Sequence, residues 1–127
     1  MIKTTRWCDP VAADDGFRQL ICRYRPRAQP KKDENWTLWR PNLGPSRELH
    51  AAFYGKHGAT PLTWHEYRGR YLGEMKEQAE EIALLAEMVA EGKTITLLCS
   101  SACENAATCH RTLLKGLIEE QLAARTK

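Results

Sequence analysis

The chain has 127 residues, a length that suits one domain, since typical domains run from about 100 to 200 residues. With 43% hydrophobic and 28% charged residues its composition is that of an ordinary folded protein, and a net charge of +3 is too small to mark a polyelectrolyte binder. No apolar run approaches the roughly 18 residues needed to cross a bilayer, and the first residues are polar rather than signal-like. We therefore expect a cytoplasmic protein without a membrane partner.

Near the amino terminus, residues 2–8 and 17–24 have the β-branched and aromatic content of short strands, with turn residues between them. Four of the six prolines then fall within residues 26–45, together with Trp36 and Trp39. This composition predicts a long loop. Loops of that length are uncommon in compact domains unless they bind a ligand or cover a site.

Two helix starts follow along the chain. Ser46 is a candidate N-cap for a helix that stops at Gly55, and the sequence from Thr63 to Glu66 fits a capping box. Apolar residues at helical spacing then continue from residue 64 to residue 92. In that stretch Gly69 and Gly73 mark a break or close packing.

The carboxyl-terminal part predicts a strand followed by a helix. Residues 94–99 form a β-branched buried run, and residues 113–122 carry an apolar helical stripe. Helices that alternate with short apolar strands indicate an α/β fold. We predict a single small domain over residues 1–127, with a short, mostly parallel sheet flanked by helices.

Charge is unevenly distributed along the chain. Residues 16–32 carry six basic side chains and no acidic one, which predicts an electropositive face. Residues 74–91 carry six glutamates against one lysine, as in a solvated helix face.

Five cysteines in so short a chain are the most informative feature of the composition. An odd count without a secretion signal favours reduced thiols over a disulfide framework. Cys8 and Cys22 lie near the ends of predicted strands, where we expect them to pack as small hydrophobic residues. The other three are Cys99, Cys103 and Cys109.

These three cysteines fall in the segment 99–111, which joins the last strand to the last helix and which we call the junction. Ligands in α/β folds bind at the carboxyl ends of parallel strands. If Thr108 caps the helix, Cys109 lies in its first turn, where the helix dipole favours a thiolate and Arg111 adds positive charge. The same helix end suits an oxyanion. A helix that starts earlier in the junction would instead place Cys109 in its interior.

The Asp9-Pro10 turn, the stretch Asp14-Asp15-Gly16-Phe17-Arg18 and the triplet Cys109-His110-Arg111 follow one another along the chain. In this order and spacing they resemble the bacterial family called domain of unknown function 488 (DUF488). The resemblance covers most of the chain and implies a small α/β fold, but no established reaction. The sequence departs from the compact branch of the family at Cys22, Arg25 and Ala28. The matching parts are Asp9-Pro10, Asp14-Asp15-Gly16-Phe17-Arg18, Arg23, Pro26-Arg27, Trp39, Pro45-Ser46-x-x-Leu49, Trp64, Tyr67, Tyr71, Cys99 and Cys109-His110-Arg111.

Our first hypothesis is an oxyanion- or phosphate-binding domain with a cysteine-based site at the junction. Cys109 or Cys99 is the candidate nucleophile or redox thiol, and Asp15 or His110 is the candidate proton carrier. Cys103 would resolve an oxidised neighbour. The partner would be a small anionic ligand, and no cofactor is predicted. The candidate anion-binding residues are Arg18, Arg23, Arg27 and Arg111.

Two alternatives remain from the same residues. The first is a nucleic-acid or nucleotide binder that uses the basic residues 18–32 with Trp36 and Trp39. The second is a structural metal site in which the three junction cysteines and His110 are ligands, although their spacing differs from that of standard zinc motifs.

Overall fold

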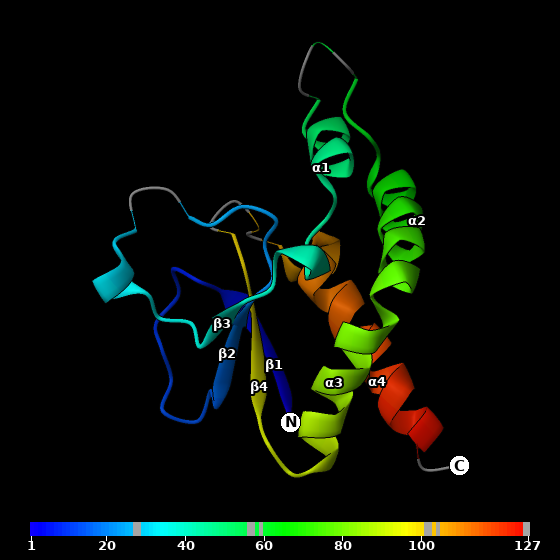
Figure 1. The fold of residues 1–127 in the computed structure, drawn as a ribbon. Helices are drawn as coiled ribbons and strands as arrows, with labels where there is room; N and C mark the ends of the chain where they lie inside the picture. Colours follow the sequence, from blue (N-terminus) through cyan, green and yellow to red (C-terminus); the bar gives the residue numbers. More distant parts are fainter. Residues whose placement is uncertain (27–28, 56–57, 59, 101–102, 104, 126–127) are drawn as a thin grey trace.

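In the part of the chain that the computed structural model describes, four parallel strands form one sheet in the order β1-β4-β2-β3 (Figure 1). The strands are β1 (Ile2–Arg6), β2 (Phe17–Leu20), β3 (Leu38–Trp39) and β4 (Ile95–Cys99). The described residues are 1–26, 29–55, 58, 60–100, 103 and 105–125.

Strand β4 lies at the centre of the sheet, and all its residues are buried. It pairs with β1 on one side and with β2 on the other, so a neighbouring strand covers each of its edges. The register places Arg6 opposite Cys99 and Leu20 opposite Leu98. The carboxyl ends of β1, β2 and β4 therefore meet at one edge of the sheet.

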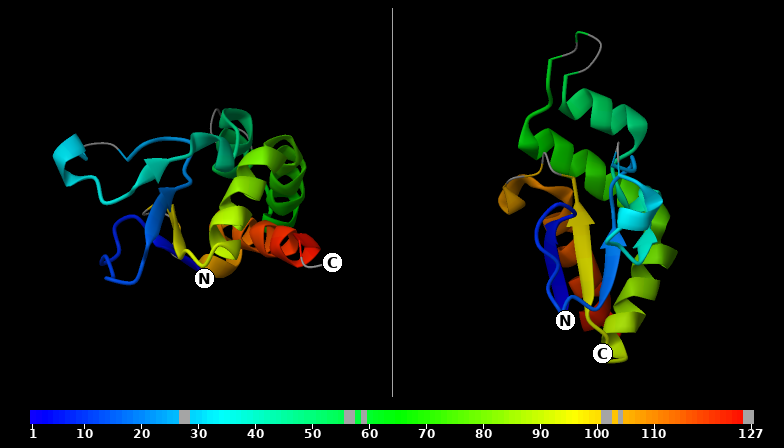
Figure 2. Two further views of the ribbon diagram at one scale, coloured as in Figure 1. Left: turned by 60° about the horizontal axis from the view of Figure 1, so that its bottom comes forward. Right: turned by 90° about the vertical axis from the view of Figure 1, so that its left-hand side faces the viewer.

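Helices α3 (Ala79–Ala90) and α4 (His110–Arg125) pack against one face of this sheet (Figure 2). The other face is covered by the loops that follow β1 and β2, so helices cover one face of the sheet and loops cover the other. This arrangement is the predicted single α/β domain, with a sheet that is wholly parallel in the described residues. The helices are α1 (Arg47–Phe53), α2 (Trp64–Met75), α3 (Ala79–Ala90) and α4 (His110–Arg125), and short 3-10 turns occupy Lys31–Asp33, Pro41–Leu43, Lys76–Gln78 and Ala106–Thr108.

Two groups of buried side chains hold the layers together. The larger group fills the space between the sheet and the helices and includes Leu97, Tyr71 and Leu114. The smaller group lies toward the carboxyl ends of the strands, and we call it the loop-side cluster. Its buried members are Leu20, Cys22, Leu98, Cys99 and Cys109, with Trp7, Trp36 and Cys103 packed against them.

Both predicted helix caps are confirmed. The side chain of Ser46 accepts a hydrogen bond from the backbone N–H of Leu49 at 3.1 Å. Thr63 and Glu66 form both bonds of the capping box. Each cap satisfies backbone donors that a helix start leaves free, which explains why the sequence located these two starts correctly.

Two expectations about the middle of the chain need correction. The helical stretch breaks at Lys76–Gln78 rather than at Gly69 or Gly73, and no heavy atom lies within 4 Å of a Cβ built at either glycine. The glycines therefore mark neither a break nor close packing. The predicted loop 26–45 also contains β3, a strand of two residues that is too short for a sequence pattern.

Gly44 allows the turn before α1 to lie directly on the chain that leaves β2. A Cβ at this position would lie 2.4 Å from the backbone nitrogen of Arg23 and 3.0 Å from the carbonyl oxygen of Ile21. Backbone atoms cannot move aside as a flexible side chain would. Only glycine fits this contact.

We expect Gly44→Ala to lower the free energy of unfolding by about 1–3 kcal/mol, the usual cost of inserting an extra carbon into a packed region. Urea unfolding followed by circular dichroism measures this change. Gly116→Ala is the matched control, because a Cβ there meets open space on α4 and helix propensity favours alanine by up to about 1 kcal/mol. Equal stability of the two variants would contradict the close contact.

Candidate functional site

Three cysteines meet where β4 ends and α4 begins. Cys99 is the last residue of β4, Cys103 lies in the following loop and Cys109 precedes α4. Their Sγ atoms all lie within 4.8 Å of one another. Cys99 and Cys109 are buried, whereas Cys103 is partly exposed. We call these three residues the cysteine cluster, and Cys103 is its accessible member.

The structure corrects the expected position of Cys109. Helix α4 begins at His110, and Cys109 is extended with φ −129° and ψ 143°, so it lies just before the helix rather than in its first turn. Consecutive side chains inside a helix diverge by about 100°. Because Cys109 is outside the helix, its Sγ lies 4.0 Å from Nδ1 of His110. The two side chains therefore converge.

The hydrogen bond of His110 determines which ring nitrogen carries the proton. Nε2 lies 2.8 Å from the carbonyl oxygen of Ile21, and a carbonyl only accepts, so Nε2 is the donor. Burial lowers the pKa of His110, which keeps the ring neutral at about pH 7. Nδ1 is then an acceptor that faces Cys109.

The thiols of the cysteine cluster differ in pKa because of the contacts among them. The pKa of Cys103 is lowered chiefly by the neighbouring thiol of Cys109 and then by that of Cys99. The Cys99 thiol also donates to the carbonyl of Ser100 at 3.7 Å. The Ser100 hydroxyl adds a further donor to the Sγ of Cys103 at 3.6 Å. Hydrogen bonding to Cys103 is also the largest cause that raises the pKa values of the other two thiols. These directions, together with the exposure of Cys103, favour Cys103 as the first thiol of the cluster to ionise.

A pocket of about 100 Å³ opens beside the cysteine cluster. Cys103, Cys109 and His110 form one side of it, and side chains from α1 and α2 form the other. Figure 1 shows α1 and the start of α2 extending beyond the carboxyl ends of the strands. A small molecule in this pocket would contact the accessible thiol.

The arginines predicted to bind an anion lie in different places. Arg111, in the first turn of α4, is only 6% exposed, and its Nε and one terminal nitrogen have no hydrogen-bond partner among the described residues. Its charge also contributes to the lowered pKa of His110, which places it near the cluster. Arg23 lines the pocket, with Nε donating to the carbonyl of Pro45 at 2.9 Å. Arg27 lies outside the described residues.

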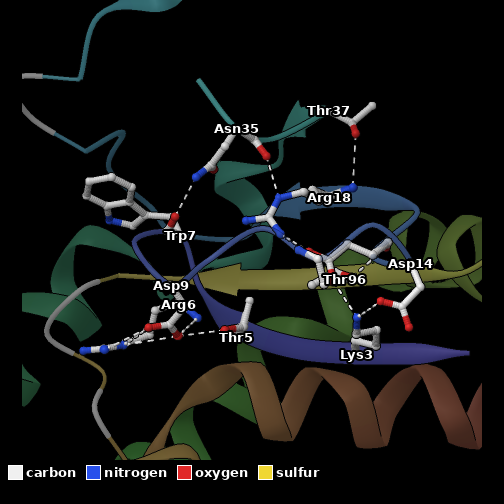
Figure 3. Close-up of polar contacts among 12 residues, drawn as sticks. Lys3, Thr5, Arg6, Trp7, Asp9, Asp14, Arg18, Asn35, Thr37 and Thr96 are labelled. Carbon is white, nitrogen blue, oxygen red and sulfur yellow. Dashed lines mark hydrogen bonds and ion pairs between the residues drawn. The ribbon is translucent and has the colours of Figure 1, made fainter. Parts of the chain in front are cut away.

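Asp15 and Arg18 lie toward the opposite end of the sheet and form a buried ion pair. Arg18 is opposite Thr96, near the amino end of β4, and its Nε donates to the carbonyl of Asn35 at 2.5 Å (Figure 3). The Asp15 carboxylate also accepts a hydrogen bond from Lys3 at 2.5 Å. The structure therefore does not bring Asp15 or Arg18 to the cysteine cluster.

Arg25, Trp36 and Trp39 make contacts within the protein. Arg25 pairs with Glu34 at 2.8 Å and lies 5.5 Å from the ring centroid of Trp36. Trp36 packs on the loop-side cluster, and the Nε1–H of Trp39 donates to the carbonyl of Cys22 at 2.8 Å. Both tryptophans therefore stabilise the fold through contacts within the protein.

The two remaining cysteines differ in exposure. Cys22 is buried as predicted, and burial raises its pKa to about 12. The prediction that Cys8 packs in the interior is wrong, because Cys8 is exposed. It lies in the turn beyond Arg6, where β1 has already ended.

Sequence reasoning missed part of the site. It gave Cys103 a secondary role, and it did not assign the ring-bearing residues of α1 or Tyr67 of α2 to the pocket. The spacing of His50, Phe53 and Tyr54 places them on neighbouring parts of a helix surface, which could have indicated a shared aromatic wall. No spacing could have revealed which loop cysteine stays accessible.

The parallel sheet and the thiols at its carboxyl edge define an α/β protein with a cysteine-containing pocket. The chain belongs to the DUF488-N3a family, described as the active DUF488-N3 subclade, whose family model matches residues 2–122. It is similar to "Uncharacterized protein YeaO" of Escherichia coli, with 33% identity over 79% of this chain and 83% of the relative. A Mycobacterium tuberculosis relative, "Uncharacterized protein Rv3073c", is 28% identical over 68% of this chain and 67% of its own length.

No solved structure matches the chain significantly. Within the described residues, no helix has both the length and the apolar character needed to cross a membrane.

Proposed function

We propose that the cysteine cluster is a thiolate site in which Cys103 attacks a small electrophile that enters the pocket. The observation that carries this proposal is the meeting of three thiols within 4.8 Å, with the partly exposed one bordering the pocket. A thiolate rather than a thiol is the nucleophile, so the donors around Cys103 favour its reaction. The family description as an active subclade agrees with a chemical role.

The proposal changes the roles within the hypothesised site. Cys109 and Cys99 are buried, so an electrophile in the pocket reaches Cys103 first. In this proposal the Cys109 thiol is the main hydrogen-bond donor to the Cys103 thiolate, since the Cys99 thiol donates to the carbonyl of Ser100 at 3.7 Å. His110 accepts a proton at Nδ1, because its Nε2–H is already committed to the carbonyl of Ile21.

The arrangement also supports a redox step. When Cys103 carries a leaving group X on sulfur, the Cys109 sulfur attacks the Cys103 sulfur, a disulfide forms and X departs with the electron pair of its bond. The Cys109 proton goes to Nδ1 of His110, 4.0 Å away. The two thiols are thereby oxidised and X is reduced. Two molecules of a small cellular thiol return the pair to its starting state: the first forms a mixed disulfide with one cysteine, and the second releases that cysteine and leaves with the first as a disulfide.

Arg111 supports the oxyanion part of the proposal. A buried guanidinium with two unpartnered nitrogens is costly unless an anion binds there. The amino end of α4 adds N–H donors and a favourable dipole. Arg111 does not line the pocket, whereas Arg23 does, so a small anionic group attached to the electrophile would meet Arg23 first.

The pH dependence of thiol alkylation tests the thiolate proposal. With its pKa lowered, Cys103 is already ionised at about pH 6 and reacts with iodoacetamide at a nearly constant rate up to about pH 8. A thiol with a normal pKa becomes about tenfold faster per pH unit over this range. Time-resolved peptide mass spectrometry measures the rate at each cysteine separately.

Cys8 is the internal reference in this experiment because it is exposed and lies in the same molecule. A Cys103 rate that rises tenfold per pH unit, or that stays below the Cys8 rate at every pH, would overturn the proposal. Protein unfolded in urea should lose the difference between the two profiles, since the donors around Cys103 are then gone.

A bound soft metal ion is the second candidate, favoured by the same convergence of sulfur atoms. Zinc and iron–sulfur clusters accept thiolate ligands, and the three sulfur atoms converge. Nδ1 of His110 lies 4.0 Å from one of them, the Sγ of Cys109. The bond from Nε2–H to a backbone carbonyl is the usual way in which a metal-binding histidine is oriented.

Metal analysis of anaerobically purified protein separates the two candidates. The thiolate proposal expects far less than one zinc or iron per chain and free reaction of Cys103. One ion per chain, lost together with helix stability in Cys99→Ser, would instead establish the metal site. Cys22→Ser is the control, because Cys22 lies in the loop-side cluster but outside the three convergent thiols.

Nucleic-acid binding receives less support from the contacts. Arg18, Arg23 and Arg25 each bond to groups of the protein, whereas Lys31 and Lys32 are exposed. Two exposed lysines give little phosphate binding, and any affinity that depends on them should fall steeply with salt.

A further inference from the structure

The pocket beside Cys103 has an aromatic wall that the thiol chemistry does not require. The wall consists of His50 and Phe53 on α1, Tyr54 directly after it, and Tyr67 on α2. Tyr67 is almost fully buried, whereas Tyr54 is 45% exposed. The wall therefore runs from the floor of the pocket to its rim.

The rings of this wall hold one another in place. The centroids of Phe53 and Tyr67 are 4.3 Å apart with a tilt of 34°, and those of His50 and Tyr54 are 4.7 Å apart with a tilt of 45°. Phe53 and Tyr54 meet edge to face at 5.4 Å. Rings that pack on one another keep their orientation, so they present fixed faces and edges to a ring that enters the pocket.

The charges of the residues that line the pocket further restrict the class of ligand that it can bind. Among the described residues of the pocket there is no carboxylate and no lysine, and Arg23 carries the permanent charge. The bond from its Nε to Pro45 fixes that guanidinium in position. With the Cys103 thiolate this charge is balanced within the pocket, so the lining suits a neutral ring.

We propose that the electrophile attacked at Cys103 carries a single flat aromatic ring, which inserts between the α1 wall and the cysteine cluster. This inference rests on the proposed thiolate function. A closed apolar cavity of about 150 Å³ binds benzene, so a pocket of about 100 Å³ with an open mouth accepts one ring but not a fused pair. The substituents of the ring lie toward Arg23 and the solvent.

Paired thiosulfonates test the inference on the intact protein. In each reaction the Cys103 thiolate attacks the sulfenyl sulfur, the S–S bond of the reagent breaks, and methanesulfinate leaves with the electron pair. Benzyl and methyl methanethiosulfonate differ only in the group transferred. We expect the ratio of benzyl to methyl rate at Cys103 to exceed the same ratio at exposed Cys8 by about tenfold or more, from burial of the ring.

Variants at the rim of the pocket show which residue causes the preference for the benzyl reagent. Tyr54→Ala should bring the Cys103 ratio down toward that of Cys8, and Tyr54→Phe should preserve it. Phe17→Ala is the matched control, since Phe17 is a similarly exposed ring, at 40%, at the opposite end of the sheet. Normalising to Cys8 in the same sample removes any general effect of the variant on reagent or fold.

The outcomes separate the inference from the function on which it rests. If neither reagent modifies Cys103 faster than Cys8, the thiolate proposal fails. If both modify Cys103 rapidly but with the Cys8 ratio, the thiolate stands and the aromatic substrate class is overturned. A high ratio that survives Tyr54→Ala unchanged also overturns the assignment of the ring to this wall.

Discussion

Replacing Cys103 by serine is expected to slow thiol labelling at about pH 6 by a factor on the order of 100, the largest loss that any single cysteine replacement should cause. A serine hydroxyl does not ionise in this range, and the remaining cluster thiols are buried. Stopped-flow measurement of methanesulfinate release from methyl methanethiosulfonate follows the fast phase. Cys8→Ser serves as the background, so that no exposed reference thiol contributes.

Replacements of Cys109 show whether its thiol acts through hydrogen bonding. Cys109→Ser keeps a donor for Cys103 and should retain most of the rate, whereas Cys109→Ala removes the donor and should shift the rate profile to higher pH. Persistence of the fast phase in Cys103→Ser would show that another cysteine is the nucleophile, and Cys109 would then be the first to examine.

Asp15→Ala is expected to destabilise the protein by about 3–5 kcal/mol, the usual effect of breaking a buried ion pair from one side. The change leaves the buried guanidinium of Arg18 without its carboxylate partner and removes the acceptor for Lys3. It also frees the backbone N–H of Ala12, which bonds to the same carboxylate at 3.0 Å. Chemical unfolding at about pH 7 measures the loss.

A double replacement and a labelling measurement complete this prediction. Asp15→Leu with Arg18→Met removes both charges and should recover much of the stability, because an apolar pair needs no partner. The Cys103 labelling rate of folded Asp15→Asn protein should equal that of the wild type, given the separation along the sheet. A slower rate at unchanged stability would restore Asp15 to the site as a proton carrier.

Features governed by neighbouring residues could be predicted from the sequence. The caps at Ser46 and Thr63 each depend on four consecutive residues of sequence. The β-branched run in β4 is typical of a strand that is buried on both faces. The position of the thiols at a strand-to-helix junction followed from the same local patterns. These predictions did not depend on tertiary contacts.

Features governed by distant contacts could not be predicted. Strand β3 exists because Leu38 and Trp39 pair with β2, and the role of Asp15 depends on the register that places Arg18 opposite Thr96. The convergence of Cys109 and His110 depends on a difference of one residue in where α4 starts. A helix boundary is not determined to that accuracy by sequence.

The unequal covering of the sheet has a consequence for how the protein opens. On the helix side, whole helices must separate from the strands before water reaches the interior. On the other side the loop-side cluster is covered by Trp7 and Trp36, which belong to loops. Partial unfolding that begins on the loop side breaks fewer contacts and therefore costs less free energy. The cysteines would then meet solvent and oxidants while the rest of the molecule stays folded. Chemical damage to this protein should accordingly begin at its thiols, well below the temperature at which the helices melt.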